Sequence, residues 1–236
     1  RAMADLEYVP NGVARALRQT RSGLLGVILP DLANPTYGLI AKQVEVVASA
    51  AGYMTVVCSS AGDDDARVSA YVRKLEGLRV DGFVLRATRE QRELIPSVLL
   101  ARAPAVLVMH DPPAIGRQLD RVLIDNALGV RLAVRHLAEH GHRHIGLVST
   151  QDLSQPTLVR LQGFLQGMTE AGLHADMAHV RIGAANAAAG EALTGELLDA
   201  RHRPTALIVA HGPQSRGALR ALRARGIRVP DDLSLV

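Results

Sequence analysis

The sequence predicts an α/β protein with two lobes, each of which contains a doubly wound parallel sheet. Short, nearly continuous apolar runs, typical of parallel strands covered on both faces, alternate along the chain with amphipathic helical patterns. The predicted strands are too many for one comfortable sheet of about six. Two lobes are therefore expected rather than one.

The expected elements follow one another in strand–helix order, which favours right-handed crossovers. Glycine follows four of the predicted helices, at Gly52, Gly141, Gly172 and Gly226, where a left-handed residue commonly ends a helix. Strands are predicted at 24–30, 54–59, 82–86, 105–110, 122–125, 145–150, 180–183 and 206–210. Helices are predicted at 35–51, 64–77, 90–102, 126–140, 156–171, 186–200 and 213–225.

Composition narrows the class of protein. Hydrophobic residues make up 48% of the 236 residues but aromatic residues only 3%, so the core must be aliphatic. No apolar run approaches the roughly 18 residues of a membrane span, and the polar segment 1–10 lacks a secretory signal. The single cysteine, Cys58, cannot form an internal disulfide and fits a reducing compartment. We therefore expect a cytoplasmic protein with no membrane association.

The first 21 residues differ from the rest of the chain. Pro10 interrupts any helix, and Asn11 can cap a short helix that carries Arg15 and Arg18. Such a helix is too short to be stable alone in water. The net charge of +4 is compatible with nucleic acid nearby, although arginine-rich composition often has a genomic origin. The segment is therefore either a cationic element that folds on binding or an ordinary linker.

Eight short segments spread over essentially the whole chain are YVPNGVARALR at 8–18, GVILPDLANP at 26–35, VDGFVL at 80–85, IDN at 124–126, GHRHIG at 141–146, RLQGF at 160–164, GAL at 217–219 and VPDDLS at 229–234. In their order and spacing these segments resemble the lactose-repressor/galactose-repressor family of transcriptional regulators. Each segment is weak evidence alone, and the set is specific.

The resemblance implies a two-lobed, periplasmic-binding-protein-like (type I) fold and a domain organisation. Residues 1–21 would be the end of a DNA-binding headpiece and a hinge helix, 22–125 the N-terminal lobe, and 126–236 the C-terminal lobe. The resemblance also implies that the sequence is truncated at both ends, with the C-terminal lobe incomplete.

The same resemblance implies a ligand-controlled repressor that binds operator DNA as a homodimer or tetramer. Leu17 matches the side chain that wedges open a base step in the minor groove. Arg15, Ala16 and Arg18 would lie beside it on the hinge helix, the arginines close to phosphates. A small-molecule effector between the lobes would change their angle and order or melt the hinge helices.

The family's effector lies at the carboxyl ends of the strands. Arg160 matches an arginine that forks onto effector hydroxyls or carboxylates, and His110 and His211 stand where sugar-binding members often carry acceptor groups. Together with Arg86 and Arg160, these histidines would make the cleft cationic, which favours an anionic effector over a neutral sugar. A degenerate pocket with no effector is the alternative. The matching positions are Thr36, Tyr37, Arg86, His110, Asp125, Arg160 and His211.

Other chemistry is not supported by the sequence. We predict no enzyme activity, catalytic residue, cofactor or metal site. His136 and His140 belong to an H-x-x-E-H pattern, but the helix ends at once and no third ligand is evident. The acidic turn at 63–65 is expected to cap the next helix rather than to bind calcium. A solute-binding protein of a transport system, which has the same bilobal fold, is the alternative function.

Overall fold

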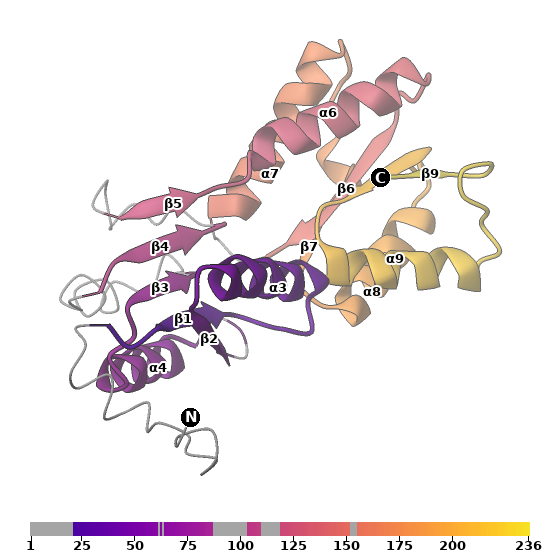
Figure 1. Ribbon diagram of the computed structural model, residues 1–236. Helices are drawn as coiled ribbons and strands as arrows, with labels where there is room; N and C mark the ends of the chain where they lie inside the picture. Colours follow the sequence, from indigo (N-terminus) through magenta and orange to yellow (C-terminus); the bar gives the residue numbers. More distant parts are fainter. Residues whose placement is uncertain (1–20, 61, 63, 87–102, 110–118, 152–154) are drawn as a thin grey trace, which may run out of the picture. The chain divides into compact units, whose positions relative to one another are not determined.

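The computed structural model describes residues 21–60, 62, 64–86, 103–109, 119–151 and 155–236 (Figure 1). The chain divides into two compact units, unit 1 at Arg1–Leu123 and unit 2 at Ile124–Val236. Each unit has a parallel sheet with helices on both faces, as the sequence predicts. The lobe boundary expected after residue 125 stays a prediction. Within the described ranges, no helix is long and apolar enough to cross a membrane.

Unit 1 is built on a five-stranded parallel sheet with the order β2-β1-β3-β4-β5. Its strands are β1 (Leu24–Leu29), β2 (Met54–Ser59), β3 (Gly82–Leu85), β4 (Ala105–Val108) and β5 (Asp120–Val122).

The two described helices of unit 1 cover opposite faces of this sheet. Helix α3 (Pro35–Ala50) packs on the face that carries Val27 and Leu29. Helix α4 (Asp65–Gly77) packs on the face that carries Ile28, because neighbouring strand residues point to opposite sides.

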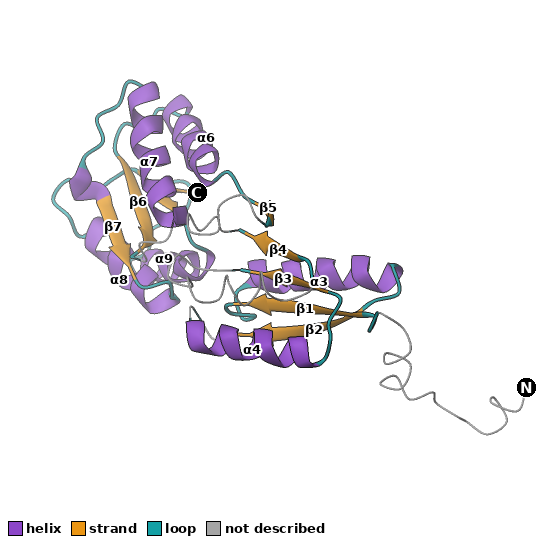
Figure 2. Cartoon of the chain, turned by 90° about the vertical axis from the view of Figure 1, so that its left-hand side faces the viewer, coloured by secondary structure: helices purple, strands orange, loops and turns teal. Residues whose placement is uncertain are grey.

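Unit 2 repeats this plan with a four-stranded parallel sheet in the order β7-β6-β8-β9. Helices α6 and α7 cover one face, and α8 and α9 cover the other (Figure 2). The strands are β6 (Ile145–Thr150), β7 (Val180–Gly183), β8 (Ala206–Val209) and β9 (Ser234–Leu235). The helices are α6 (Asn126–Glu139), α7 (Gln155–Glu170), the short 3₁₀ helix η2 (Met177–His179), α8 (Ala187–Leu198) and α9 (Gly212–Ala224).

One strand prediction is wrong. The sequence pattern places a strand at 122–125, whereas β5 is Asp120–Val122 and pairs with β4. Asp120 and Arg121 are polar, so an apolar run cannot reveal this edge strand. Four other predicted strands end one or two residues earlier than expected, and 54–59, 145–150 and 180–183 match the structure. The helix expected at 90–102 lies outside the described residues.

Local signals in the sequence fix the helix ends. The four predicted glycines all have positive φ, and at Gly52 the following amide of Tyr53 donates to Ala48 O at 2.9 Å, which closes the helix end. Asp64 accepts a hydrogen bond from Arg67 N at 3.0 Å, so the acidic turn caps α4 as expected.

Candidate functional site

The order of the strands defines a site-forming edge in each unit. In both sheets the first strand of the unit lies between the second and the third. The direction in which successive strands are added to the sheet therefore reverses, at β1/β3 in unit 1 and at β6/β8 in unit 2. Ligands of open α/β sheets bind at the carboxyl ends of strands beside such a switch point. The side chains that follow these strands are therefore the candidates for ligand contacts in each unit.

In unit 1, Tyr37 and Arg86 lie together at this edge. Tyr37 is in the first turn of α3, the helix that follows β1 after a short loop, and Arg86 immediately follows β3. The guanidinium carbon of Arg86 lies 5.9 Å from the centre of the Tyr37 ring, a cation–π arrangement. Arg86 is buried, with 9% of its surface exposed, and its amide donates to Ile28 O at 3.1 Å. A buried cation is thus held at the switch point.

Tyr37 serves the core as well as this edge. Its side chain is partly buried and packs against the cluster formed by Val27, Leu29 and Val108. Thr36, its neighbour, is exposed, and its amide donates to the capping side chain of Asn34 at 3.1 Å. Packing therefore holds the Tyr37 ring close to Arg86, while Thr36 remains accessible.

The end of β4 has a constrained backbone. Met109, immediately after this strand, has φ of +62°, a conformation that costs free energy for residues with a side chain. Its amide donates to Val122 O at 2.8 Å, which ties the turn to β5. The predicted effector residue His110 comes next but lies outside the described residues, as do the hinge residues Arg15, Ala16, Leu17 and Arg18.

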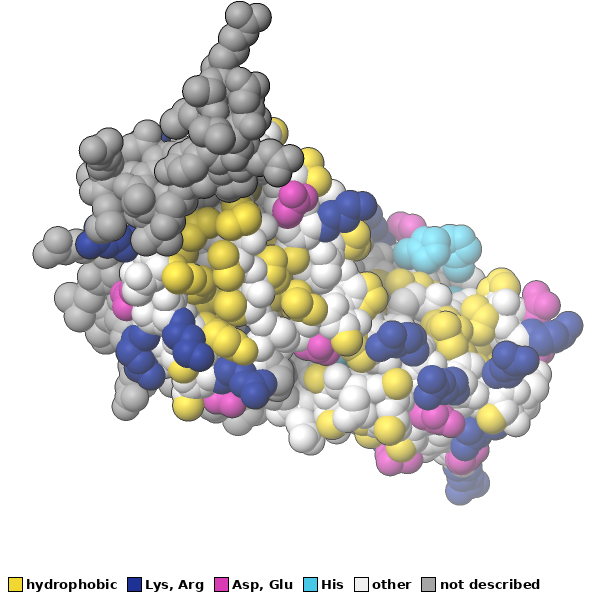
Figure 3. All heavy atoms as spheres, turned by 60° about the horizontal axis from the view of Figure 1, so that its bottom comes forward, with side chains coloured by type: hydrophobic (Ala, Val, Ile, Leu, Met, Phe, Trp, Pro, Cys, Tyr) yellow, Lys and Arg dark blue, Asp and Glu magenta, His cyan; other side chains and the backbone are white. Residues whose placement is uncertain are grey.

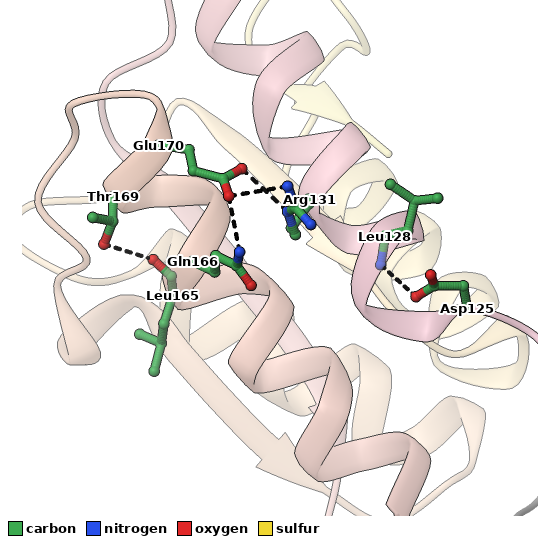
Figure 4. Close-up of polar contacts among 7 residues, drawn as sticks. All are labelled: Asp125, Leu128, Arg131, Leu165, Gln166, Thr169 and Glu170. Carbon is green, nitrogen blue, oxygen red and sulfur yellow. Dashed lines mark hydrogen bonds and ion pairs between the residues drawn. The ribbon is translucent and has the colours of Figure 1, made fainter.

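In unit 2, Arg160 and Asp125 lie close to the start of α6 but form hydrogen bonds with different residues. Arg160 Nε donates to Asn126 Oδ1 at 3.0 Å, which links α7 to the start of α6. Asp125 accepts from Leu128 N at 2.9 Å and so caps α6 (Figure 4). Asn126 is a site residue that the sequence analysis missed, although it adjoins Asp125 in the same motif.

An ion pair fixes α6 against α7 further along. Arg131 Nη2 lies 3.0 Å from Glu170 Oε1, and Gln166 Nε2 donates to the same carboxylate at 2.9 Å (Figure 4). Gly163 allows the two helices to approach, because a Cβ atom there would lie 2.6 Å from Ala127 O. This packing places Arg160, three residues before Gly163, next to Asn126.

His211 occupies the other side of the unit 2 switch point. It is partly buried, follows β8 after one residue, and is the N-cap residue of α9, although its side chain makes no capping hydrogen bond. The N-terminal end of a helix carries a partial positive charge of roughly half a unit. The first turn of α9 therefore creates an electropositive environment beside His211, at the carboxyl end of β8.

Two further polar residues of this edge were not found from the sequence. Thr150, the last residue of β6, and Thr157 on α7 share a buried hydrogen bond of 2.7 Å between their hydroxyls. Threonine is common in strands and helices, so neither residue type nor spacing signals this contact. The pair joins the end of β6 to the helix that carries Arg160.

The histidine pair rejected as a metal site has a local structural contact. The rings of His136 and His140 lie 4.3 Å apart, and His140 Nδ1 lies 2.7 Å from His136 O. Among the described residues, no group of three or more His, Cys, Asp or Glu side chains is placed to hold a metal ion.

Comparisons with known proteins agree with this architecture. Residues 134–236 match the model of the periplasmic binding protein-like domain. The HTH-type transcriptional regulator DegA of Bacillus subtilis is 30% identical over 237 residues, which cover 99% of this chain and 69% of DegA. A Lac repressor bound to ONPG in the repressed state has a TM-score of 0.82 and 28% identity, covering 99% of this chain and 70% of the repressor. The regulator CelR in complex with cellobiose has a TM-score of 0.78 and 29% identity, covering 100% and 70%.

The fold and both carboxyl edges define a periplasmic-binding-protein-like α/β protein. The similarity to DegA extends over nearly the whole chain and includes more than the matched domain. The chain belongs to the LacI (lactose-repressor/galactose-repressor) family of transcriptional regulators. DegA, CytR and PurR are named as transcriptional regulators or repressors, and the match to a periplasmic binding protein-like domain supports an effector-binding domain of such a regulator.

Proposed function

We propose that this chain is the effector-binding and dimerisation region of a DNA-binding repressor that acts in the cytoplasm and whose operator affinity is controlled by a small molecule. The observation that carries the proposal is Arg86, a buried cation beside Tyr37 at the switch point of unit 1. Ligands of open α/β sheets bind at such a switch point, and a guanidinium there is suited to recognise a negatively charged group. The proposed effector site comprises Thr36, Tyr37, Arg86, His110, Asp125, Arg160 and His211.

The charges at these edges favour an anionic effector such as a sugar phosphate or a carboxylate-bearing metabolite. Arg86 and Arg160 offer fork-shaped donors that match a phosphate or carboxylate. The N-terminal ends of α3 and α9 follow β1 and β8 and favour negative charge. Two related structures are described with other ligands, one with ONPG and one with cellobiose, an uncharged sugar. The effector that we propose differs from these ligands in carrying a negative charge.

Calorimetry with glucose 6-phosphate and glucose tests the proposal. We expect measurable binding of the phosphorylated sugar and at least tenfold weaker binding of glucose. Arg86→Met should weaken binding of glucose 6-phosphate by about 10–100-fold, because a hydrogen bond to a charged group contributes about 1.5–3 kcal/mol. Arg143→Met is the matched control, since Arg143 is exposed and donates to Ala138 O ahead of β6, at the opposite end of the sheet. Binding of glucose alone would refute the anionic effector.

The hinge provides the proposed link to DNA. Residues 8–18 would form paired hinge helices in the minor groove, with Leu17 as the wedge. Further along the chain, Ser22 N and Gly23 N donate to the two carboxylate oxygens of Asp81 at 2.9 and 2.8 Å. This anchorage supports the proposal, because it fixes the residues that lead into β1 and so provides a path from unit 1 to the hinge segment.

Operator binding by the full-length regulator tests the hinge. We expect Leu17→Ala to weaken specific operator binding by at least tenfold at fixed salt, and Arg18→Ala to reduce the salt dependence of binding. A Leu78→Ala variant, changed at an exposed leucine of unit 1, serves as the control. Unchanged operator affinity for Leu17→Ala would remove the wedge role.

A homodimer is the proposed assembly, and one face of unit 1 fits it. Helix α3 and the edge strand β2 pack together and expose large apolar side chains, which are Leu39, Val46, Val47, Met54 and Val57. Figure 3 shows hydrophobic side chains gathered on the surface of unit 1. An edge strand with exposed apolar neighbours invites association, and a second copy would cover it. We name this set the α3/β2 face.

A further inference from the structure

Gln214 is a fully buried polar residue outside the proposed effector site. It is the third residue of α9 and has 0% of its surface exposed. Its side-chain nitrogen donates to three backbone carbonyls, those of Ser149 at 3.0 Å, Ala184 at 3.1 Å and Gly183 at 3.4 Å. These carbonyls belong to the ends of β6 and β7, so one side chain ties two strand ends to the first turn of α9.

Stability alone does not account for a glutamine at this position. Its Oε1 is buried and accepts no hydrogen bond from the described residues. A buried acceptor without a donor costs free energy, whereas an apolar side chain of similar length would avoid that cost. Residues that break a local rule in this way are expected at functional sites.

The contacts of Gln214 connect it to the segments next to His211, a proposed effector residue of unit 2. Helix α9 begins directly after His211, and β6 adjoins β8 at the switch point. Gly183 O also accepts from Gln151 N at 2.8 Å, and Ala184 O accepts from Asn186 N at 2.8 Å. The carbonyls that Gln214 holds therefore also organise the segments that leave β6 and β7.

The backbone of Gln214 is itself fixed in place. Gly190 on α8 lies so close that a Cβ atom there would collide with the backbone of Gln214. The amide group therefore reaches the strand ends from a rigid base, and the length of its side chain sets the distance between α9 and those ends.

We propose that Gln214 is a positioning residue for the effector site, holding the carboxyl ends of β6 and β7 at a fixed distance from His211 and the start of α9. The role rests on the proposed function for its effect on ligand affinity. Its effect on the strand ends is independent of that function and can be measured in the absence of ligand.

The test compares Gln214→Met and Gln214→Glu with a matched control, Thr194→Val. Thr194 is also fully buried, with a hydroxyl that makes no hydrogen bond among the described residues, but it lies on α8 away from these carbonyls. In the ligand-free protein, hydrogen exchange at the amides of Gln151 and Asn186 should accelerate about tenfold in Gln214→Met and stay unchanged in the control. Affinity for glucose 6-phosphate should fall about tenfold in Gln214→Met, with wild-type affinity in the control.

The glutamate variant separates positioning from simple packing. An ionised carboxylate would repel the three carbonyls, whereas a protonated carboxyl can donate to one of them. Affinity for glucose 6-phosphate in Gln214→Glu should therefore recover partly as the pH falls from about 8 to about 6, relative to wild type at each pH. This variant also provides the test if Gln214→Met does not fold.

The outcomes distinguish the two proposals. Unchanged exchange at Gln151 and Asn186 in Gln214→Met overturns the role of Gln214, as does faster exchange with unchanged affinity. If the wild-type protein does not bind glucose 6-phosphate, the result contradicts the proposed anionic effector and not the role of Gln214. Hydrogen exchange in the ligand-free protein then decides whether Gln214 holds the strand ends. Faster exchange at Gln151 and Asn186 in the Gln214 variants, with unchanged exchange in Thr194→Val, supports the role.

Discussion

A single methyl group added at Gly217 should destabilise unit 2 by interfering with the packing of α8 on α9. Gly217 is buried in α9, and a Cβ atom there would collide with Ala187 O and come within 2.5 Å of Glu191 N. Both are backbone atoms, so the helices must separate to make room. Overpacking costs typically 1–3 kcal/mol, and the upper part of that range, about 2–3 kcal/mol, applies here because both neighbours are backbone atoms. Improved helix propensity offsets about 1 kcal/mol of this cost. We expect a net loss of about 1–2 kcal/mol for Gly217→Ala.

Thermal unfolding monitored by circular dichroism measures this loss. For a chain of this size, 1 kcal/mol corresponds to roughly 2–4 °C, so the Tm of Gly217→Ala should fall by about 2–8 °C. Gly129→Ala is the control, because Gly129 is also within a helix but a Cβ atom there meets nothing within 4 Å. That variant should be neutral or raise the Tm. Equal or higher Tm for Gly217→Ala would show that the close approach of α8 and α9 is not required.

Two further predictions concern surface charge and assembly. Hydrogen bonds from Arg228 hold the pKa of Asp232 at about 2, below its ordinary value of 3.8, so the stabilising contribution is present above about pH 4 and lost as the pH falls towards 2. The Tm difference between wild type and Asp232→Asn should accordingly shrink between about pH 5 and pH 2 and in high salt, and a constant difference would contradict this explanation. Val47→Asp, on the α3/β2 face with 69% of its surface exposed, should shift the protein to monomers in sedimentation velocity. Leu78→Asp, at an exposed position after α4, should not, and a dimeric Val47→Asp protein would place the interface elsewhere.

The elements of the fold could be predicted where their signals are local. Strands such as β6 are uniformly apolar because both faces are buried, and its predicted range of 145–150 matches the structure. Helix ends at Gly141 and Gly172 follow from conformations that glycine adopts readily. Strand β5 could not be predicted in the same way, since Asp120 and Arg121 belong to an edge strand whose pairing with β4 defines it.

The candidate site was predictable in part. Resemblance to a family placed Tyr37 and Arg86 at strand ends, and the structure brings their side chains to 5.9 Å. The roles of these residues and of Arg160 and His211 in effector binding stay proposals. Asn126 lies in the matched segment 124–126 but was not singled out, because its partner Arg160 lies 34 residues along the chain. Gln214 was missed because no motif contains it and its partner Ser149 lies 65 residues away.

The α/β class, the alternation of strands and helices, and the caps that end the helices could be predicted from the sequence, because they depend on residues within one turn or one strand of each other. The contact of Arg160 with Asn126, 34 residues away, and that of Gln214 with Ser149, 65 residues away, depend on how the whole chain folds. Such contacts depend on the order β7-β6-β8-β9 and on how α6 to α9 pack across its two faces. Hydrophobic burial favours many arrangements of such elements, and close packing together with the satisfaction of buried polar groups selects one of them.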